Sequence, residues 1–83
     1  MRHLSILVVE DEPALGDLLK IHLLREGHQV TWVASGEEAL AHLDRDGAEL
    51  VFLDIGLPGL SGLEVLQRIR RAGKPVEVIL MTA

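Results

Sequence analysis

A single carboxylate at the end of an apolar run is the feature of this sequence that most clearly suggests chemistry. Residues 50–53 are all apolar, Asp54 follows directly, and a loop with Gly56 and Pro58 comes next. A short apolar run bounded by turn residues predicts a strand that is buried on both faces. That strand would deliver Asp54 to its carboxyl end, where an acid acts either as a cap or as a reactive group.

Two further acids and a hydroxyl occupy comparable positions. Glu10 and Asp11 follow the first apolar run of the chain, and Thr82 follows the last one. In open α/β sheets, ligands bind outside the carboxyl ends of the strands, near the point where the strand order reverses. The spacing therefore predicts one cluster that contains three carboxylates and the hydroxyl of Thr82.

Such a cluster suggests metal-assisted phosphoryl chemistry. If the first and third strands are neighbours, the carboxylates lie about 5 Å apart, and each pair repels by about 3 kcal/mol at an effective dielectric of about 20. A divalent cation or protonation of one carboxyl relieves this repulsion. The chain has no cysteine and no histidines at ligand spacing, so an all-oxygen site favours Mg²⁺. A carboxylate beside Mg²⁺ can attack phosphorus and hold the phosphoryl group as an acyl phosphate.

Apolar segments that alternate with amphipathic ones position these side chains. Strands joined by helices predict an α/β fold, a doubly wound parallel sheet with right-handed crossovers and helices on both faces. The second strand is more polar than the others and is expected at an edge. The strands are predicted at residues 4–9, 29–33, 50–54 and 76–81, and the helices between them are expected to end at Gly27, Gly47 and Gly73.

The helix starts carry capping signals. Asp11 is the expected N-cap of the first helix, because Pro13 then falls in the first turn. Ser35 and Ser61 each precede a glutamate by three residues, which is the spacing of a capping box. Because Ser61 caps the helix after Asp54, we interpret Asp54 as a reactive group. The first helix is expected to bury one face formed by Leu15, Leu18, Leu19, His22 and Leu23.

Composition narrows the class of protein. With 48% hydrophobic and 25% charged residues in 83, the chain is expected to form one globular domain with an ordinary polar surface. No apolar run is long enough to cross a bilayer, and no signal peptide is recognisable. The absence of cysteines fits a cytoplasmic location. The net charge of −5 and the presence of only two aromatic residues, Trp32 and Phe52, argue against nucleic acid binding by this segment. Trp32 is interpreted as partial core.

Three motifs together resemble the receiver domain of bacterial two-component response regulators. They are Val-Glu-Asp-Glu at 9–12, Leu-Asp-Ile-Gly-Leu-Pro-Gly-Leu-Ser-Gly at 53–62 and Met-Thr-Ala at 81–83. The residues of the second and third motifs are most similar to those of the OmpR/PhoB subfamily. The resemblance covers the whole chain. It implies a flavodoxin-like (CheY-like) doubly wound sheet with strand order 2-1-3-4. It also identifies residues 1–83 as the N-terminal portion of the domain, without the fifth strand and the last two helices.

The resemblance also implies a function. Asp54 would be the phosphoacceptor, which takes a phosphoryl group from a histidine kinase. Mg²⁺ would be bound by Asp11, Asp54 and the backbone carbonyl of Gly56, with Glu10 acting through water. The domain would then be a signalling module and not an enzyme, and the parent protein would regulate transcription through a C-terminal DNA-binding domain.

The resemblance assigns a switch and shows one departure from the family pattern. Thr82 and Ala83 would contact the phosphoryl group and switch the distal surface. The lysine that ends the family's fifth strand has no counterpart in this chain. Lys74 precedes the fourth strand, so it belongs at the opposite end of the sheet.

Other functions stay open. A Mg²⁺-dependent phosphohydrolase would normally have a second acid two residues after its nucleophile. This chain has Gly56 at that position, which argues against a phosphohydrolase. A structural fragment without phosphotransfer is another possibility, because the lysine, the last strand and two helices of the family have no counterpart here. The exposed, apolar fourth strand at residues 76–81 is expected to pair with another chain, or the fragment to be only loosely folded. Dinucleotide binding is disfavoured, since Gly56, Gly59 and Gly62 lack the Gly-x-Gly-x-x-Gly spacing.

Overall fold

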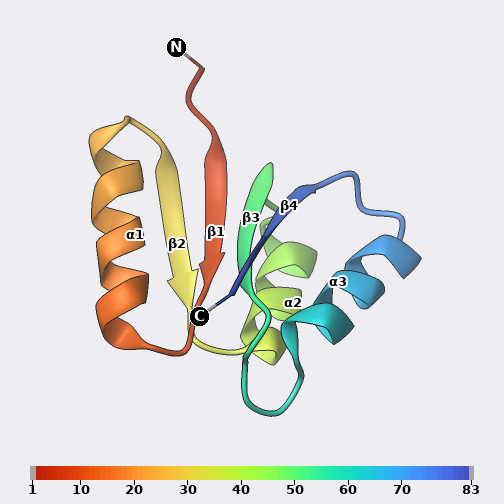
Figure 1. The fold of residues 1–83 in the computed structure, drawn as a ribbon. Helices are drawn as coiled ribbons and strands as arrows, with labels where there is room; N and C mark the ends of the chain where they lie inside the picture. The colour runs from red at the N-terminus through yellow and green to blue at the C-terminus, as the bar shows by residue number, and fades with distance from the viewer. Residues whose placement is uncertain (1, 83) are drawn as a thin grey trace.

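In a computed structural model, which describes residues 2–82, four strands alternate with three helices (Figure 1). All neighbouring strands are parallel, and the order is β2-β1-β3-β4. The predicted doubly wound fold and its strand order are confirmed. The elements are β1 (Ser5–Val9), α1 (Pro13–Arg25), β2 (Gln29–Val33), α2 (Gly36–Arg45), β3 (Leu50–Asp54), α3 (Gly62–Arg71) and β4 (Glu77–Met81).

The sheet separates α1 on one face from α2 and α3 on the other (Figure 1). Side chains alternate between the two faces of a strand, and those that point toward α2 and α3 form the main core. Full burial of a valine, leucine or isoleucine side chain contributes about 1.5–3 kcal/mol to the stability of the fold. The fully buried members from the central strands and the two helices are Leu7, Val9, Val51, Leu53, Ala39, Val65 and Ile69.

The inward face predicted for α1 is only partly confirmed. Leu19 and Leu23 are half-buried, whereas Leu15, Leu18 and His22 are exposed. Apolar residues occur all around this helix, so their spacing does not single out one face. The prediction for these three side chains was wrong.

A close approach between α1 and β2 explains which face of the helix lies against the sheet. Gly16 is the buried residue of α1, and a Cβ atom there would lie 2.2 Å from Cε2 of Trp32. The helix therefore rests on the indole ring at the one residue that has no side chain. Trp32 itself is half-buried, as expected.

The helix starts differ from one another. The N-cap of α1 is Glu12, without a side-chain capping bond, so the prediction of Asp11 was wrong. Glu10 supplies a local acceptor instead, because its Oε2 lies 3.1 Å from the backbone nitrogen of Glu12 and accepts that N–H. Ser61 forms the complete capping box predicted for α3. Oγ of Ser35 accepts the backbone N–H of Glu38, as predicted for α2. The second bond of a capping box, from the Ser35 backbone N–H to the Glu38 side chain, is not formed.

The predicted helix ends are confirmed. Gly27, Gly47 and Gly73 follow their helices with φ angles of 89°, 73° and 72°, which an L side chain rarely adopts.

Candidate functional site

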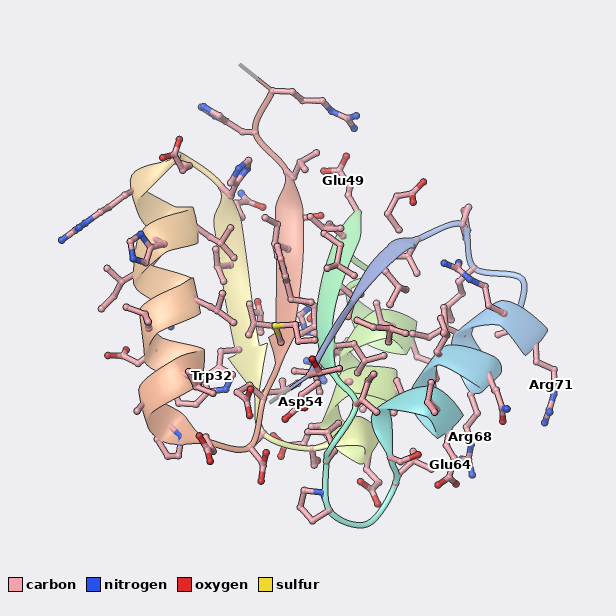
Figure 2. The ribbon with its side chains drawn as sticks, in the orientation of Figure 1. Trp32, Glu49, Asp54, Glu64, Arg68 and Arg71 are labelled. Carbon is pink, nitrogen blue, oxygen red and sulfur yellow. The ribbon has the colours of Figure 1, made fainter. Side chains whose placement is uncertain are left out.

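Three carboxylates meet at the carboxyl edge of the sheet. One carboxylate oxygen from each of Glu10, Asp11 and Asp54 lies within 4.8 Å of the others. The pairing of β1 with β3 causes this, because Val9 is in register with Leu53 and the residue that follows each one emerges at the same edge. In Figure 2, Asp54 lies at the end of β3 from which the loop to α3 leaves. The predicted meeting of the three acids and their spacing are confirmed.

Burial makes this cluster unfavourable for charge. Glu10 is 4% exposed and Asp54 is 7% exposed, and they are the buried polar residues among those described. Burial raises the pKa of the Glu10 carboxyl above its usual value, the N–H of Glu12 opposes the rise, and the neighbouring Asp54 carboxylate adds to it. Asp11 is more exposed than the other two. A cation bound by these oxygens would offset the repulsion between them.

The loop after β3 holds Asp54 in a fixed orientation. Oδ1 of Asp54 accepts the backbone N–H of Gly56 at 2.9 Å, so this acid also caps the turn that follows it. Asp54 therefore acts as a cap through Oδ1, in addition to the reactive role predicted for it, and Oδ2 can bind other partners.

Helix α3 begins directly against the backbone of Asp54. A Cβ atom at Gly62 would lie 2.2 Å from the carbonyl oxygen of Asp54, and the N–H of Gly62 donates to the carbonyl of Ile55 at 3.2 Å. Only glycine permits this approach. The first residue of α3 thus fixes the end of β3 from the outside.

Both backbone groups of Glu10 are also engaged. Its N–H donates to the carbonyl of Val33 at 3.1 Å, which continues the β1–β2 ladder by one residue. Its carbonyl accepts the indole N–H of Trp32 at 2.9 Å. This contact between Trp32 and the cluster was not predicted from the sequence. The register of β1 with β2, in which Trp32 lies opposite Val8, is the signal that would have revealed it.

The remaining predicted site residues are placed as follows. Thr82 is exposed and comes directly after Met81, which is in register with Asp54, so its backbone reaches the same edge of the sheet. Ala83 lies outside the described residues. Lys74 pairs its Nζ with Oδ1 of Asp44 at 2.9 Å, before β4 begins, and this confirms its expected place at the opposite end of the sheet.

The donor set fits a hard divalent cation. Three carboxylates supply only oxygen, and the chain contains no cysteine that would favour a softer metal. The backbone carbonyl of Gly56 belongs to the same loop as Asp54 and is a further oxygen candidate. Within the residues that the structure describes, no helix is both long and apolar enough to cross a bilayer.

Comparison with known proteins gives one consistent result. The sequence profile of the response regulator receiver domain matches residues 6–83. The chain is 48% identical over 79 residues to the sensory transduction protein RegX3 of Mycobacterium tuberculosis, and the match covers 95% of this chain and 34% of RegX3. It is 43% identical to the transcriptional regulatory protein AfsQ1 of Streptomyces coelicolor, over 95% of this chain and 35% of that protein. The chain therefore spans about a third of the length of these curated relatives.

Solved structures agree. The response regulator TrrA of Thermotoga maritima, described in complex with Mg²⁺ and BeF, superposes with a TM-score of 0.90 at 46% identity, and the match covers all of this chain and 70% of that one. The N-terminal domain of a response regulator receiver protein from Methanoculleus marisnigri gives a TM-score of 0.91 at 36% identity, over 96% of this chain and 67% of that one.

Proposed function

Because the chain belongs to the response regulator receiver domain family, we propose that Asp54 is a phosphoacceptor that receives its phosphoryl group from a histidine kinase. The observation that carries this proposal is the meeting of three carboxylates within 4.8 Å at the carboxyl edge of the sheet. A cluster of like charges with two buried members is unfavourable unless a cation compensates it. A cation bound by the cluster would also attract an anionic phosphoryl group.

Mg²⁺ is the proposed cofactor. Asp11, Asp54 and the Gly56 carbonyl would hold it directly, and Glu10 would act through water. When bound, Mg²⁺ supplies positive charge that neutralises the cluster and the oxygens of the phosphoryl group. The likeness to TrrA, which is described with Mg²⁺ and BeF, supports this assignment.

Several residues of this chain have separate roles in the transfer of the phosphoryl group. Oδ1 of Asp54 is held by the Gly56 N–H, so Oδ2 is the attacking atom. An Oδ2–P bond forms while the N–P bond of the phosphorylated kinase histidine breaks, and that nitrogen keeps the electron pair. The product is an acyl phosphate on Asp54. Thr82 and Ala83 would then contact the phosphoryl oxygens and relay the change, so that the domain acts as a signalling module and not as an enzyme.

The wider role follows the relatives. AfsQ1 is a transcriptional regulatory protein and RegX3 is a sensory transduction protein, and the chain spans about a third of each. We infer that residues 1–83 are the N-terminal portion of a receiver domain in a cytoplasmic, OmpR-type transcription regulator, whose DNA-binding part lies outside them. A phosphohydrolase is disfavoured, because Gly56 stands where such an enzyme would carry its second acid.

The test is phosphorylation by acetyl phosphate with Mg²⁺. Wild-type chain is expected to gain the mass of one phosphoryl group, and Asp54→Ala to gain none. Asp44→Asn is the matched control, since this exposed aspartate lies at the other end of the sheet with Lys74 and should leave the yield unchanged. A Mg²⁺-independent adduct, or an adduct that persists in Asp54→Ala, would contradict the proposal.

The outer edge of β4 supports a second partner, another copy of this chain. β4 ends the strand order, so its outward N–H and C=O groups have no strand partner among the described residues. Ile79 is 45% exposed and Leu80 is 38% exposed, and Glu77 is the one charged residue in the strand. An exposed apolar edge of this kind is a template for pairing with a second copy.

Sedimentation velocity tests this association. Wild-type chain is expected to form dimers or larger species, and Ile79→Lys to shift it toward monomer, because a charge at an edge strand blocks pairing. Leu63→Lys changes a similarly exposed apolar residue on α3 and should leave the association unchanged. A monomeric wild type across the concentration series would rule this partner out.

A further inference from the structure

The carbonyl of Glu10 receives an unusual hydrogen-bond donor. The N–H of Glu10 donates to the carbonyl of Val33 in the β1–β2 ladder. In a regular parallel ladder, the carbonyl of Glu10 would then accept the N–H of the residue two positions after Val33. That residue is Ser35, which has left β2 and serves as the N-cap of α2. The indole N–H of Trp32 takes over this bond at 2.9 Å. A side chain therefore completes the ladder at the point where the acidic cluster begins.

The indole ring is itself held in place. It lies against α1 at Gly16, where a Cβ atom would come within 2.2 Å of the ring. The N–H of Gly16 donates to the carbonyl of Glu12 at 3.0 Å, in the first turn of α1, so the helix that holds the ring begins next to the cluster. Figure 2 shows Trp32 between α1 and the sheet, toward the same end of the molecule as Asp54.

Three hydrogen bonds thus converge on Glu10. They fix its N–H, its carbonyl and, through the N–H of Glu12, its carboxylate oxygen Oε2. The peptide that joins Glu10 to Asp11 carries a ligand candidate on each side. When this peptide is fixed, both carboxylates are oriented before a cation arrives, and less ordering remains for the binding step.

We propose that Trp32 is a positioning residue for the metal site, which raises Mg²⁺ affinity by holding the Glu10–Asp11 peptide through its indole N–H. The proposal rests on the Mg²⁺ site of the proposed function. In this role Trp32 acts through the carbonyl of Glu10 and not as a ligand of the cation. Its contribution is the donor atom, and this separates it from a residue that only fills space between α1 and the sheet.

The experiment measures the Mg²⁺ dissociation constant by titration calorimetry on the full chain. Trp32→Phe keeps an aromatic ring against Gly16 and removes the donor. A second variant places benzothienylalanine at position 32, which keeps the shape of the two fused rings and replaces N–H with sulfur. Val30→Ala is the control, because it removes packing from the same strand at a half-buried residue without touching the cluster. Thermal unfolding without Mg²⁺ is recorded for every variant.

We expect both Trp32 variants to raise the dissociation constant about tenfold, the lower end of what outer-shell partners contribute. Val30→Ala should lower the melting temperature and leave the dissociation constant at the wild-type value. Wild-type affinity in the benzothienylalanine variant would overturn the role of Trp32, even if Trp32→Phe failed to fold. A wild-type chain that binds no Mg²⁺ would overturn the metal site itself, which is a separate result.

Discussion

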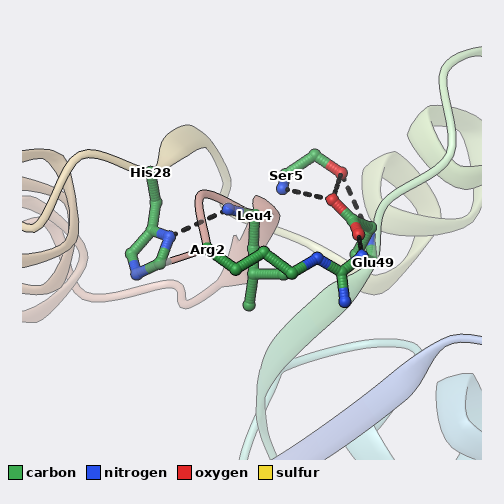
Figure 3. A network of polar contacts seen from close by, with 5 residues as sticks. All are labelled: Arg2, Leu4, Ser5, His28 and Glu49. Carbon is green, nitrogen blue, oxygen red and sulfur yellow. Dashed lines mark hydrogen bonds and ion pairs between the residues drawn. The ribbon is translucent and has the colours of Figure 1, made fainter.

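The two ends of the sheet treat carboxylates in opposite ways. At the amino end, Oε1 of Glu49 accepts the N–H of Ser5 at 3.0 Å, and its other oxygen pairs with Arg2 (Figure 3). Asp44 pairs with Lys74 at the same end. These acids tie neighbouring segments together, and each has a basic partner.

At the carboxyl end, three acids gather without a base. Among residues 2–82, the ion pairs that the structure shows do not include Glu10, Asp11 or Asp54. The same kind of side chain therefore stabilises one end and strains the other. Among the described residues, the acids at the carboxyl end therefore lack the basic partners that Glu49 and Asp44 have at the amino end.

The largest expected effect breaks the geometry of the carboxyl end. Gly62→Ala would place a Cβ atom 2.2 Å from the carbonyl oxygen of Asp54, so α3 and the end of β3 must move apart. We expect the free energy of unfolding in urea to fall by about 3 kcal/mol. Gly56→Ala is the control, because its Cβ atom would meet only Oδ1 of Asp54, at 3.6 Å. Equal loss in both variants would show that the close approach is unimportant.

Mg²⁺ should remove the strain at the carboxyl end. At a hundredfold excess over its dissociation constant, Mg²⁺ is expected to stabilise the wild type by about 2.7 kcal/mol. The raised pKa of Glu10 sets the sign with pH: without metal, stability falls as pH rises through that pKa, because the buried carboxyl must then ionise. Mg²⁺ stabilisation should therefore be smaller at low pH, where a proton competes with it. Thermal unfolding across pH, with and without Mg²⁺, checks both trends.

Neutralisation of one acid at the carboxyl end should stabilise the metal-free chain. Asp54→Asn removes one charge and keeps an Oδ1 atom that can accept the Gly56 N–H. The free energy of unfolding without Mg²⁺ is expected to rise by about 1–2 kcal/mol, because repulsion among oxygens that lie within 4.8 Å of one another is relieved. Stabilisation by Mg²⁺ should largely disappear. A destabilised Asp54→Asn chain would show that the cluster is not strained.

The same kind of substitution at the amino end should have the opposite sign and the smallest effect. Glu49→Gln loses the ion pair with Arg2, which is largely exposed, and keeps an oxygen for the Ser5 N–H. We expect the free energy of unfolding to fall by about 0.5 kcal/mol, and by less at high salt. Urea unfolding at two salt concentrations measures this. Opposite signs for Glu49→Gln and Asp54→Asn would support the comparison between the two ends.

Much of the fold could be predicted because its signals are local. Apolar runs, glycines after helices and the capping box at Ser61 each depend on a few adjacent residues. The strand order came from the resemblance to receiver domains, since alternation of strands and helices does not fix which strands are neighbours. The acids of the cluster were found because each one lies at the end of a strand or within two residues after it.

The remaining features depend on tertiary contacts. Apolar residues surround α1, so the buried face could not be read from spacing, and the choice depends on the fit of Gly16 to Trp32. The bond from Trp32 to the Glu10 carbonyl depends on the register of two strands more than twenty positions apart. The N-cap of α1 was misplaced by one residue, because Glu10 satisfies the N–H of Glu12 from outside the helix.

The position of β1 in the sheet has a consequence for synthesis of the chain. β1 is made first, but it lies between β2 and β3, and its pairing with β3 joins Ile6 to Leu50. While the ribosome is still making α2, β1 has at most one neighbour, and one row of its backbone groups faces water or other proteins. The core side chains of Leu7 and Val9 are then also uncovered. The nascent chain is therefore most open to chaperones and to mispairing until β3 has emerged.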